Sequence, residues 1–148
     1  IPAHTMLAIM YHESKFVPDA VPPKRKPASA FGFIEKRISS AYGYAQALDG
    51  TWDEYRMRTG NMSARRYRFE DSMDFIGWYL NRSVNELNIS RRNAYHLYLA
   101  YHQGNYGFKT KSYENKPAIK NYARKVQRTA VKYMHQLNSC QNRLAHRL

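Results

Sequence analysis

The stretch Met6-Leu-Ala-Ile-Met-Tyr-His-Glu-Ser14 decides how this sequence is interpreted, because it places a single carboxyl group on an apolar segment. Residues 3–14 are predicted to form a helix, one face of which carries Leu7, Met10, Tyr11 and Ser14. Glu13 is the only acidic residue among the first 18. A carboxyl group at the apolar end of a helix tends to keep its proton, because ionisation there costs solvation free energy. Glu13 is therefore a candidate general acid of the kind that cleaves glycosidic bonds, and the alternative is a solvated Glu at a helix end.

Length and composition fit one globular domain. The chain has 148 residues, of which 43% are hydrophobic, and this is enough to bury a core. Helical periodicity begins close to Ile1, so the sequence resembles an excised or processed domain, and no apolar run is long enough to cross a bilayer. We expect a folded domain over residues 1–138 and a C-terminal tail over residues 139–148 that either extends the last helix or frays.

The net charge indicates an anionic partner. The chain carries 24 Lys and Arg against 11 Asp and Glu, a formal net charge of +13. Nucleic acid and a bacterial cell wall, with its free carboxylates and acidic polymers, are both compatible with this charge. The 13 tyrosines suit stacking on bases or on sugar rings as well as ordinary packing. Composition alone does not separate these partners.

Metal and thiol chemistry are not expected. His12-Glu13 begins like a zinc-protease helix, but Phe16 occupies the position of the second histidine. Cys140 is the only cysteine, so it forms no internal disulfide, and no His and Asp pattern around it supports a catalytic thiol. The sequence therefore predicts neither a metal ion nor a cofactor.

The rest of the chain is predicted to be mostly helical. Thr51 and Glu54 are interpreted as a capping box for a helix that ends at Gly60. Further helices are predicted over residues 70–87, from a Ser90 cap to Gly104, and onward from Pro117, with a loop over residues 104–107. No sustained alternation of apolar and polar residues appears, so the fold class is mainly α, a compact helical globule.

The segment from Pro22 to Ser39 is expected to be different. Its prolines limit regular structure, yet Phe31, Phe33 and Ile34 are too apolar for a plain linker. We expect a short strand or flap whose aromatic side chains pack inward and whose Lys24-Arg-Lys26 run faces solvent.

Three segments carry a family resemblance when they are taken together. They are Glu13-Ser14, then Ala41-Tyr-Gly-Tyr-Ala-Gln46 followed by Asp49-Gly-Thr-Trp52, and then Ala100-Tyr-His-Gln-Gly104. Their order and spacing resemble the lysozyme-like lytic transglycosylases of the soluble-lytic-transglycosylase type, relatives of goose-type lysozyme. That family shows Glu-Ser, then Gly-Leu-Met-Gln before a Pro-x-Thr turn, then Ala-Tyr-Asn-Ala-Gly. The resemblance covers roughly residues 3–125, includes a helix ending in Tyr79-Leu80, and implies a lysozyme-like helical domain with a groove.

The resemblance implies a reaction with one catalytic carboxyl group. Glu13 would protonate the bridging oxygen of the β-1,4 bond between N-acetylmuramic acid (MurNAc) and N-acetylglucosamine (GlcNAc) in peptidoglycan. The same residue, now ionised, would take the proton of the C6 hydroxyl, so that O6 attacks C1 and leaves a 1,6-anhydroMurNAc end. The substrate-binding residues implied are Ser14, Gly43, Tyr44, Gln46, Tyr101 and His102, with the Tyr101 hydroxyl steering Glu13. The implied location is the bacterial periplasm or cell envelope, with envelope-spanning secretion or phage machinery as the host assembly.

Simpler roles stay open for several of these residues. The Ser14 hydroxyl can satisfy a helix end, Gly43 can be a turn glycine, and Tyr101 can be a core aromatic. An amide such as that of Gln46 needs a partner in an apolar setting, which favours a binding role.

The sequence also departs from the family pattern. Tyr44-Ala45 replaces Leu-Met, His102-Gln103 replaces Asn-Ala, and Asp49 replaces the proline of the turn. Asp49 and Glu35 are the only acidic residues between Asp19 and Asp53, and either could position water for lysozyme-type hydrolysis. A non-catalytic cell-wall glycan binder and a nucleic-acid-binding module are the other functions compatible with the chain, although no nucleic-acid recognition motif is present.

Overall fold

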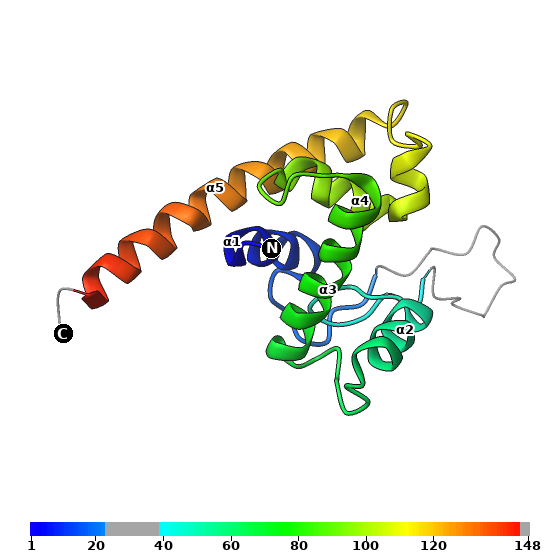
Figure 1. Cartoon of the computed structure of the whole chain (residues 1–148), viewed down its shortest axis with the longest axis horizontal. Helices are drawn as coiled ribbons and strands as arrows, with labels where there is room; N and C mark the ends of the chain where they lie inside the picture. Colours follow the sequence, from blue (N-terminus) through cyan, green and yellow to red (C-terminus); the bar gives the residue numbers. More distant parts are fainter. Residues whose placement is uncertain (23–38, 146–148) are drawn as a thin grey trace, which may run out of the picture.

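The computed structural model describes residues 1–22 and 39–145. The described chain contains five helices in the order α1 (Ala3–Ser14), α2 (Asp49–Thr59), α3 (Phe69–Leu87), α4 (Ala94–Lys109) and α5 (Pro117–Ala145). Figure 1 shows α1 near the centre of the molecule, where it packs against α3 and α5, while α4 packs on both α3 and α5. The only β-type pairing in the described part is one antiparallel bridge between Tyr42 and Ala47. The prediction of a mainly helical domain is confirmed.

Some of the predicted helix ends agree with the structure and others do not. The predictions for α1 and α3 agree with the structure to within one residue. The capping box is wrong, because α2 begins at Asp49 after an N-cap at Leu48 and no side chain caps it. Glu54 instead accepts a hydrogen bond from Nη1 of Arg82 on α3 at 2.9 Å. Gly60 ends α2 in the left-handed conformation, as predicted.

The start of α4 and its expected end also differ from the prediction. Asn93, and not Ser90, caps the helix, because its Oδ1 accepts the backbone N–H of His96 at 3.0 Å. Gly104 kinks the helix with φ 74° and ψ 162°, but helix resumes to Lys109, so the predicted loop over residues 104–107 is wrong. The resumed turn is held on α3, since Ser83 Oγ donates to Oδ1 of Asn105 at 2.7 Å.

Two further expectations concern the insertion and the tail. The predicted flap, with Glu35 in it, falls on residues 23–38 and lies outside the described residues. Residues 139–145 belong to α5, so the tail extends the last helix as far as Ala145. No described helix is both long and apolar enough to span a bilayer.

The core is built from the inner faces of all five helices. Ala8, Ile9 and Met10 of α1 are completely buried. Beside them the aromatic rings of α2 and α3 pack closely, with the centroids of Trp52 and Phe75 separated by 5.1 Å. This packing fixes α1 on several sides, so a polar group at its C-terminal end is drawn into an apolar environment.

Helix α5 has one buried face and one basic face. Ile119, Ala123, Val126 and Ala130 are buried against the body of the molecule. Lys120, Arg124, Arg128 and Lys132 follow one another every four residues along the outer side, and α5 contains no acidic residue. Figure 1 shows the C-terminal half of this helix running away from the other helices.

The segment that joins residue 40 to α2 is a tight loop fixed by backbone contacts. Gly43 has φ +76°, and its N–H donates to the carbonyl of Ala20 at 2.9 Å. Nε2 of Gln46 donates to the carbonyls of Ala20 and Gly43, at 2.9 and 2.8 Å. A Cβ atom on Gly43 would lie 2.2 Å from the carbonyl oxygen of Arg66, so glycine is required there by the fold itself.

Gly43→Ala should therefore lower the free energy of unfolding by about 2–5 kcal/mol, since positive φ and a backbone clash both oppose the new methyl group. Gly60→Ala is the matched control, because Gly60 has φ +73° but nothing within 4 Å of its Cβ position. The control should lose only the about 1–2 kcal/mol that the left-handed conformation costs. Urea denaturation of both variants measures the difference, and equal losses would show that the Arg66 backbone moves aside without cost.

Candidate active site

Glu13 opens into a groove that runs along α4. The first part is a cavity of about 430 Å³ whose lining includes Glu13, Tyr98, His102 and Tyr122. The second part, of about 290 Å³, is lined by Gln46, Tyr79, Tyr101 and Gln103 among others. His102 lines both cavities, so the two lie next to each other along α4.

The Glu13 carboxyl group lies largely buried at the C-terminal end of α1. Burial raises the pKa of Glu13 from 4.5 to about 7. A hydrogen bond from Tyr98 and the charge of Lys15 act in the opposite direction and lower the pKa, but burial is the largest effect. Glu13 is thus able to give up and regain a proton near neutral pH, which is the property that a general acid and base requires.

Three tyrosines surround this carboxyl group. Burial and the charge of Glu13 both raise the pKa values of Tyr98, Tyr101 and Tyr122. All three hydroxyls therefore remain protonated and act as neutral donors. The Tyr122 hydroxyl donates to the carbonyl oxygen of His12 at 3.0 Å and so pins α5 to the end of α1.

Tyr101 joins α4 to the loop before α2. Its hydroxyl donates to the carbonyl oxygen of Ala45 at 2.6 Å, and its ring meets that of Tyr79 edge-on at 5.2 Å. The hydroxyl that was expected to steer Glu13 is thus committed to the loop backbone. Tyr98 is the tyrosine that hydrogen-bonds Glu13.

Of the binding residues expected in the loop before α2, one lines the groove and two do not. Gln46 lines the groove, although its Nε2 already braces the loop. Gly43 faces the Arg66 backbone, and the ring of Tyr44 packs edge-on against Phe69 with centroids 5.8 Å apart. Neither Gly43 nor Tyr44 is among the residues that line the groove.

Ser14 and His102 also differ in placement. The Ser14 side chain is buried, and its Oγ donates to the carbonyl of Met10 at 3.1 Å, which is the local helix-end role. His102 lines the groove, and its Nδ1 lies 2.7 Å from Nε2 of Gln103. Burial and the nearby charge of Lys116 lower the pKa of His102, so the ring is neutral at pH 7.

Of the two acidic residues considered as a second carboxylate, only Asp49 is described. Its Oδ1 pairs with Nη2 of Arg66 at 2.7 Å, and it lines a different cavity from Glu13. Within residues 1–22 and 39–145, no three His, Cys, Asp or Glu side chains come together as metal ligands.

The sequence pattern did not single out two residues of the candidate site, Tyr98 and Tyr122. The available signal was spacing, because Tyr98 lies three residues before Tyr101 and the two must share a face of α4. Tyr122 is brought to Glu13 by the packing of α5 on α1, which no local pattern reveals.

The comparison with known protein families agrees with this geometry. The family model described as "Transglycosylase SLT domain" matches residues 1–140. No curated protein and no solved structure matches the chain. Since the match extends over nearly the whole sequence, the chain belongs to the transglycosylase SLT domain family, the peptidoglycan lytic transglycosylases.

Proposed function

We propose that this domain cleaves the MurNAc-GlcNAc β-1,4 bond of peptidoglycan with Glu13 as its only catalytic carboxyl group, and that it leaves 1,6-anhydroMurNAc ends. The observation that carries the proposal is the raised pKa of Glu13 at the wall of a groove lined by tyrosines. The family identifies peptidoglycan, a polymer of the cell envelope, as the substrate. Within the envelope, we propose the bacterial periplasm as the place of action.

The first step uses the protonated form of Glu13. Its proton passes to the bridging oxygen, the bond from that oxygen to C1 breaks, and the GlcNAc side departs as an alcohol. Positive charge develops at C1 and the ring oxygen, and the neighbouring N-acetyl group of the substrate helps to stabilise it. Glu13 is now a carboxylate, and the hydrogen bond from Tyr98 stabilises that form.

The second step uses the ionised form. The carboxylate of Glu13 takes the proton from the C6 hydroxyl of MurNAc, and O6 forms a bond to C1. The enzyme returns to its starting protonation state and no water is consumed. A pKa close to the working pH serves both steps, because neither proton transfer is then strongly uphill.

Positioning is assigned to the polar groups along α4. We propose that His102, Gln46 and Gln103 bind hydroxyl and N-acetyl groups of the glycan, since these side chains line the groove. Tyr101 acts as a positioning residue, because its hydroxyl holds the Ala45 carbonyl and thereby the loop that carries Gln46. Gly43, Tyr44 and Ser14 serve the fold around the groove.

The hydrolytic alternative has less support. Asp49 is paired with Arg66 and faces another cavity, so it is poorly suited to activate water beside Glu13. Burial of an ionisable group lowers the free energy of unfolding. A non-catalytic glycan binder would gain nothing in return for burying Glu13, so this alternative has less support.

Glu13→Gln should abolish peptidoglycan cleavage while the fold is kept. Loss of a general acid lowers a rate by about a hundredfold to ten-thousandfold, and here the same group serves two steps. The release of soluble fragments from purified peptidoglycan measures the rate, and circular dichroism checks the fold. Glu70→Gln is the control, because Glu70 is an exposed residue of the first turn of α3. A Glu13→Gln protein that digests peptidoglycan at the wild-type rate would remove Glu13 from the mechanism.

The free energy of unfolding should depend on pH through Glu13. Between pH 4.5 and about 7 the folded protein holds a proton on Glu13 that the unfolded chain has lost, so stability falls as the pH rises. Relative to Glu13→Gln, the wild-type protein should lose about 3 kcal/mol across this window and little above it. Parallel urea titrations at pH 4.5, 6 and 8 measure the difference. A gap between the two proteins that does not change with pH would mean that the carboxyl group is solvated.

The products should carry 1,6-anhydroMurNAc ends, because the proposed mechanism brings the C6 hydroxyl and not water to C1. Mass spectrometry separates the two outcomes, since the anhydro product is lighter than the reducing product by one water. Predominantly reducing MurNAc ends would instead support hydrolysis and return Asp49 or Glu35 to consideration.

A further inference from the structure

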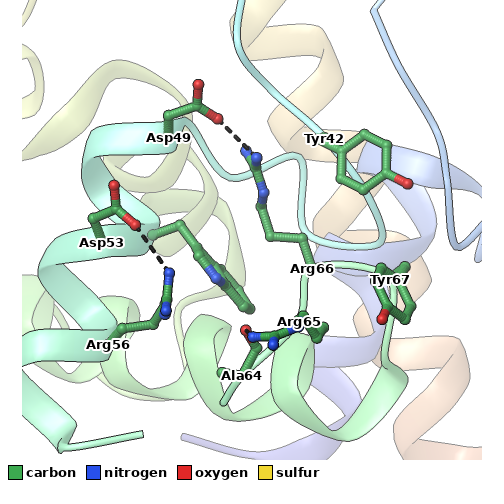
Figure 2. Close-up of a pocket in the computed structure, with 9 residues that line it drawn as sticks. Tyr42, Asp49, Asp53, Arg56, Ala64, Arg65, Arg66 and Tyr67 are labelled. Carbon is green, nitrogen blue, oxygen red and sulfur yellow. Dashed lines mark hydrogen bonds and ion pairs between the residues drawn. The ribbon is translucent and has the colours of Figure 1, made fainter. Parts of the chain in front are cut away.

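A further cavity among the described residues lies apart from the groove of Glu13. It has a volume of about 460 Å³ and shares no lining residue with either part of that groove. Its walls come from α2, from Tyr42 and from the segment over residues 64–67, which leads into α3. Figure 2 shows side chains from these three places directed toward a common space.

Two Arg–Asp pairs lie in the walls of this cavity. Arg66 pairs with Asp49 at 2.7 Å and also donates to the carbonyl of Ala47 at 2.9 Å. Arg56 pairs with Asp53 at 3.3 Å and donates to a loop carbonyl at 2.7 Å. Both pairs are drawn as dashed lines in Figure 2. These two guanidinium groups are therefore neutralised and held by the protein before any ligand arrives.

A third arginine lining the cavity is different. Arg65 is exposed and has no carboxylate partner among the described residues. Its one side-chain hydrogen bond in that part of the chain runs from Nη1 to the carbonyl of Ala64 at 3.2 Å. Most of its five N–H donors thus remain available, and it gives the cavity a surplus positive charge.

Trp52 also lines this cavity, and its largely buried ring packs against Phe75. The ring adds an apolar surface to the wall. A carboxylate is the ligand group that would pair with the uncommitted guanidinium of Arg65.

The aromatic walls indicate what carries that carboxylate. Tyr67 is 52% exposed, and Tyr42 lies under the guanidinium of Arg66 at 5.3 Å from its ring centroid. Rings of this kind pack against the aliphatic parts of a chain while charged groups bind its ends. An acidic peptide offers this combination, whereas an uncharged glycan offers Arg65 no anionic partner.

We propose that this cavity is a second binding site, which holds a carboxylate of the peptide stems of peptidoglycan while the glycan lies in the groove of Glu13. The proposal rests on peptidoglycan as the substrate but not on the chemistry assigned to Glu13. Binding of a stem here would favour glycan that carries peptides over stripped glycan, and it would do so without contact with the reacting bond.

Calorimetric titration with the free tripeptide L-Ala-γ-D-Glu-diaminopimelate tests the site. Arg65→Ala should weaken binding by about tenfold to a hundredfold, the range for a hydrogen-bonded charge. Arg58→Ala removes the same charge from an exposed part of α2 outside the cavity and should change the affinity by less than about twofold. Glu13→Gln should bind the tripeptide as the wild type does, so a failure of the catalytic proposal leaves this result intact.

The matched ligand is the same tripeptide with its carboxyl groups amidated, which should bind the wild type as weakly as the free tripeptide binds Arg65→Ala. Thermal unfolding of the wild type and of Arg65→Ala checks that the substitution keeps the fold. No measurable binding to the wild type, equal binding of the amidated tripeptide, or unchanged affinity in Arg65→Ala would each overturn the proposal. So would displacement of the tripeptide from the wild type by chitotetraose, which would make the cavity a glycan site.

Discussion

The burial of one carboxyl group follows from the packing of α1, on which the rest of this domain depends. Ala8, Ile9 and Met10 of this helix are completely buried, and its contacts with α3 and α5 hold Glu13, near its C-terminal end, inside the protein. The same apolar packing that stabilises the fold raises the pKa of Glu13 to about 7. Tyr98 lowers the pKa of Glu13 only in part, because its hydroxyl is a neutral donor. A positively charged arginine in its place would hold the carboxyl group ionised. Ionisation of this buried carboxyl group lowers the free energy of unfolding, and the function proposed for Glu13 carries that cost.

The parts of the fold that the sequence predicted are those where local pattern and packing agree. Apolar spacing places α1 and α3 to within one residue. In α3 the buried residues Ser72, Ile76, Leu80 and Ser83 recur at helical spacing. Helix caps were less predictable. Ser90 and Asn93 are both good capping residues, and only the turn that precedes α4 decides between them.

Within the site, Glu13 could be predicted from the sequence, because a single acidic residue stands out in an apolar segment. Tyr98 was not, because a tyrosine on the inner face of a helix satisfies the apolar pattern whether or not its hydroxyl does chemistry. For Gly43 the resemblance implied a substrate contact while a turn glycine stayed open, and the structure places this residue against the backbone of Arg66, 23 residues later in the chain. Contacts between distant segments of this kind leave no local signature, and the second cavity with its paired arginines is hidden for the same reason.

The basic outer face of α5 has a consequence for how the enzyme finds its substrate. Its cations have no carboxylate on the same helix to neutralise them, so their field extends outward until dissolved salt screens it, over about 8 Å at physiological ionic strength. An anionic wall attracts such a surface without requiring any one orientation of the glycan. The domain can then remain near the polymer between cleavage events and move along it, as a cation moves along a polyanion. The ionic strength consequently governs how often the domain meets the polymer.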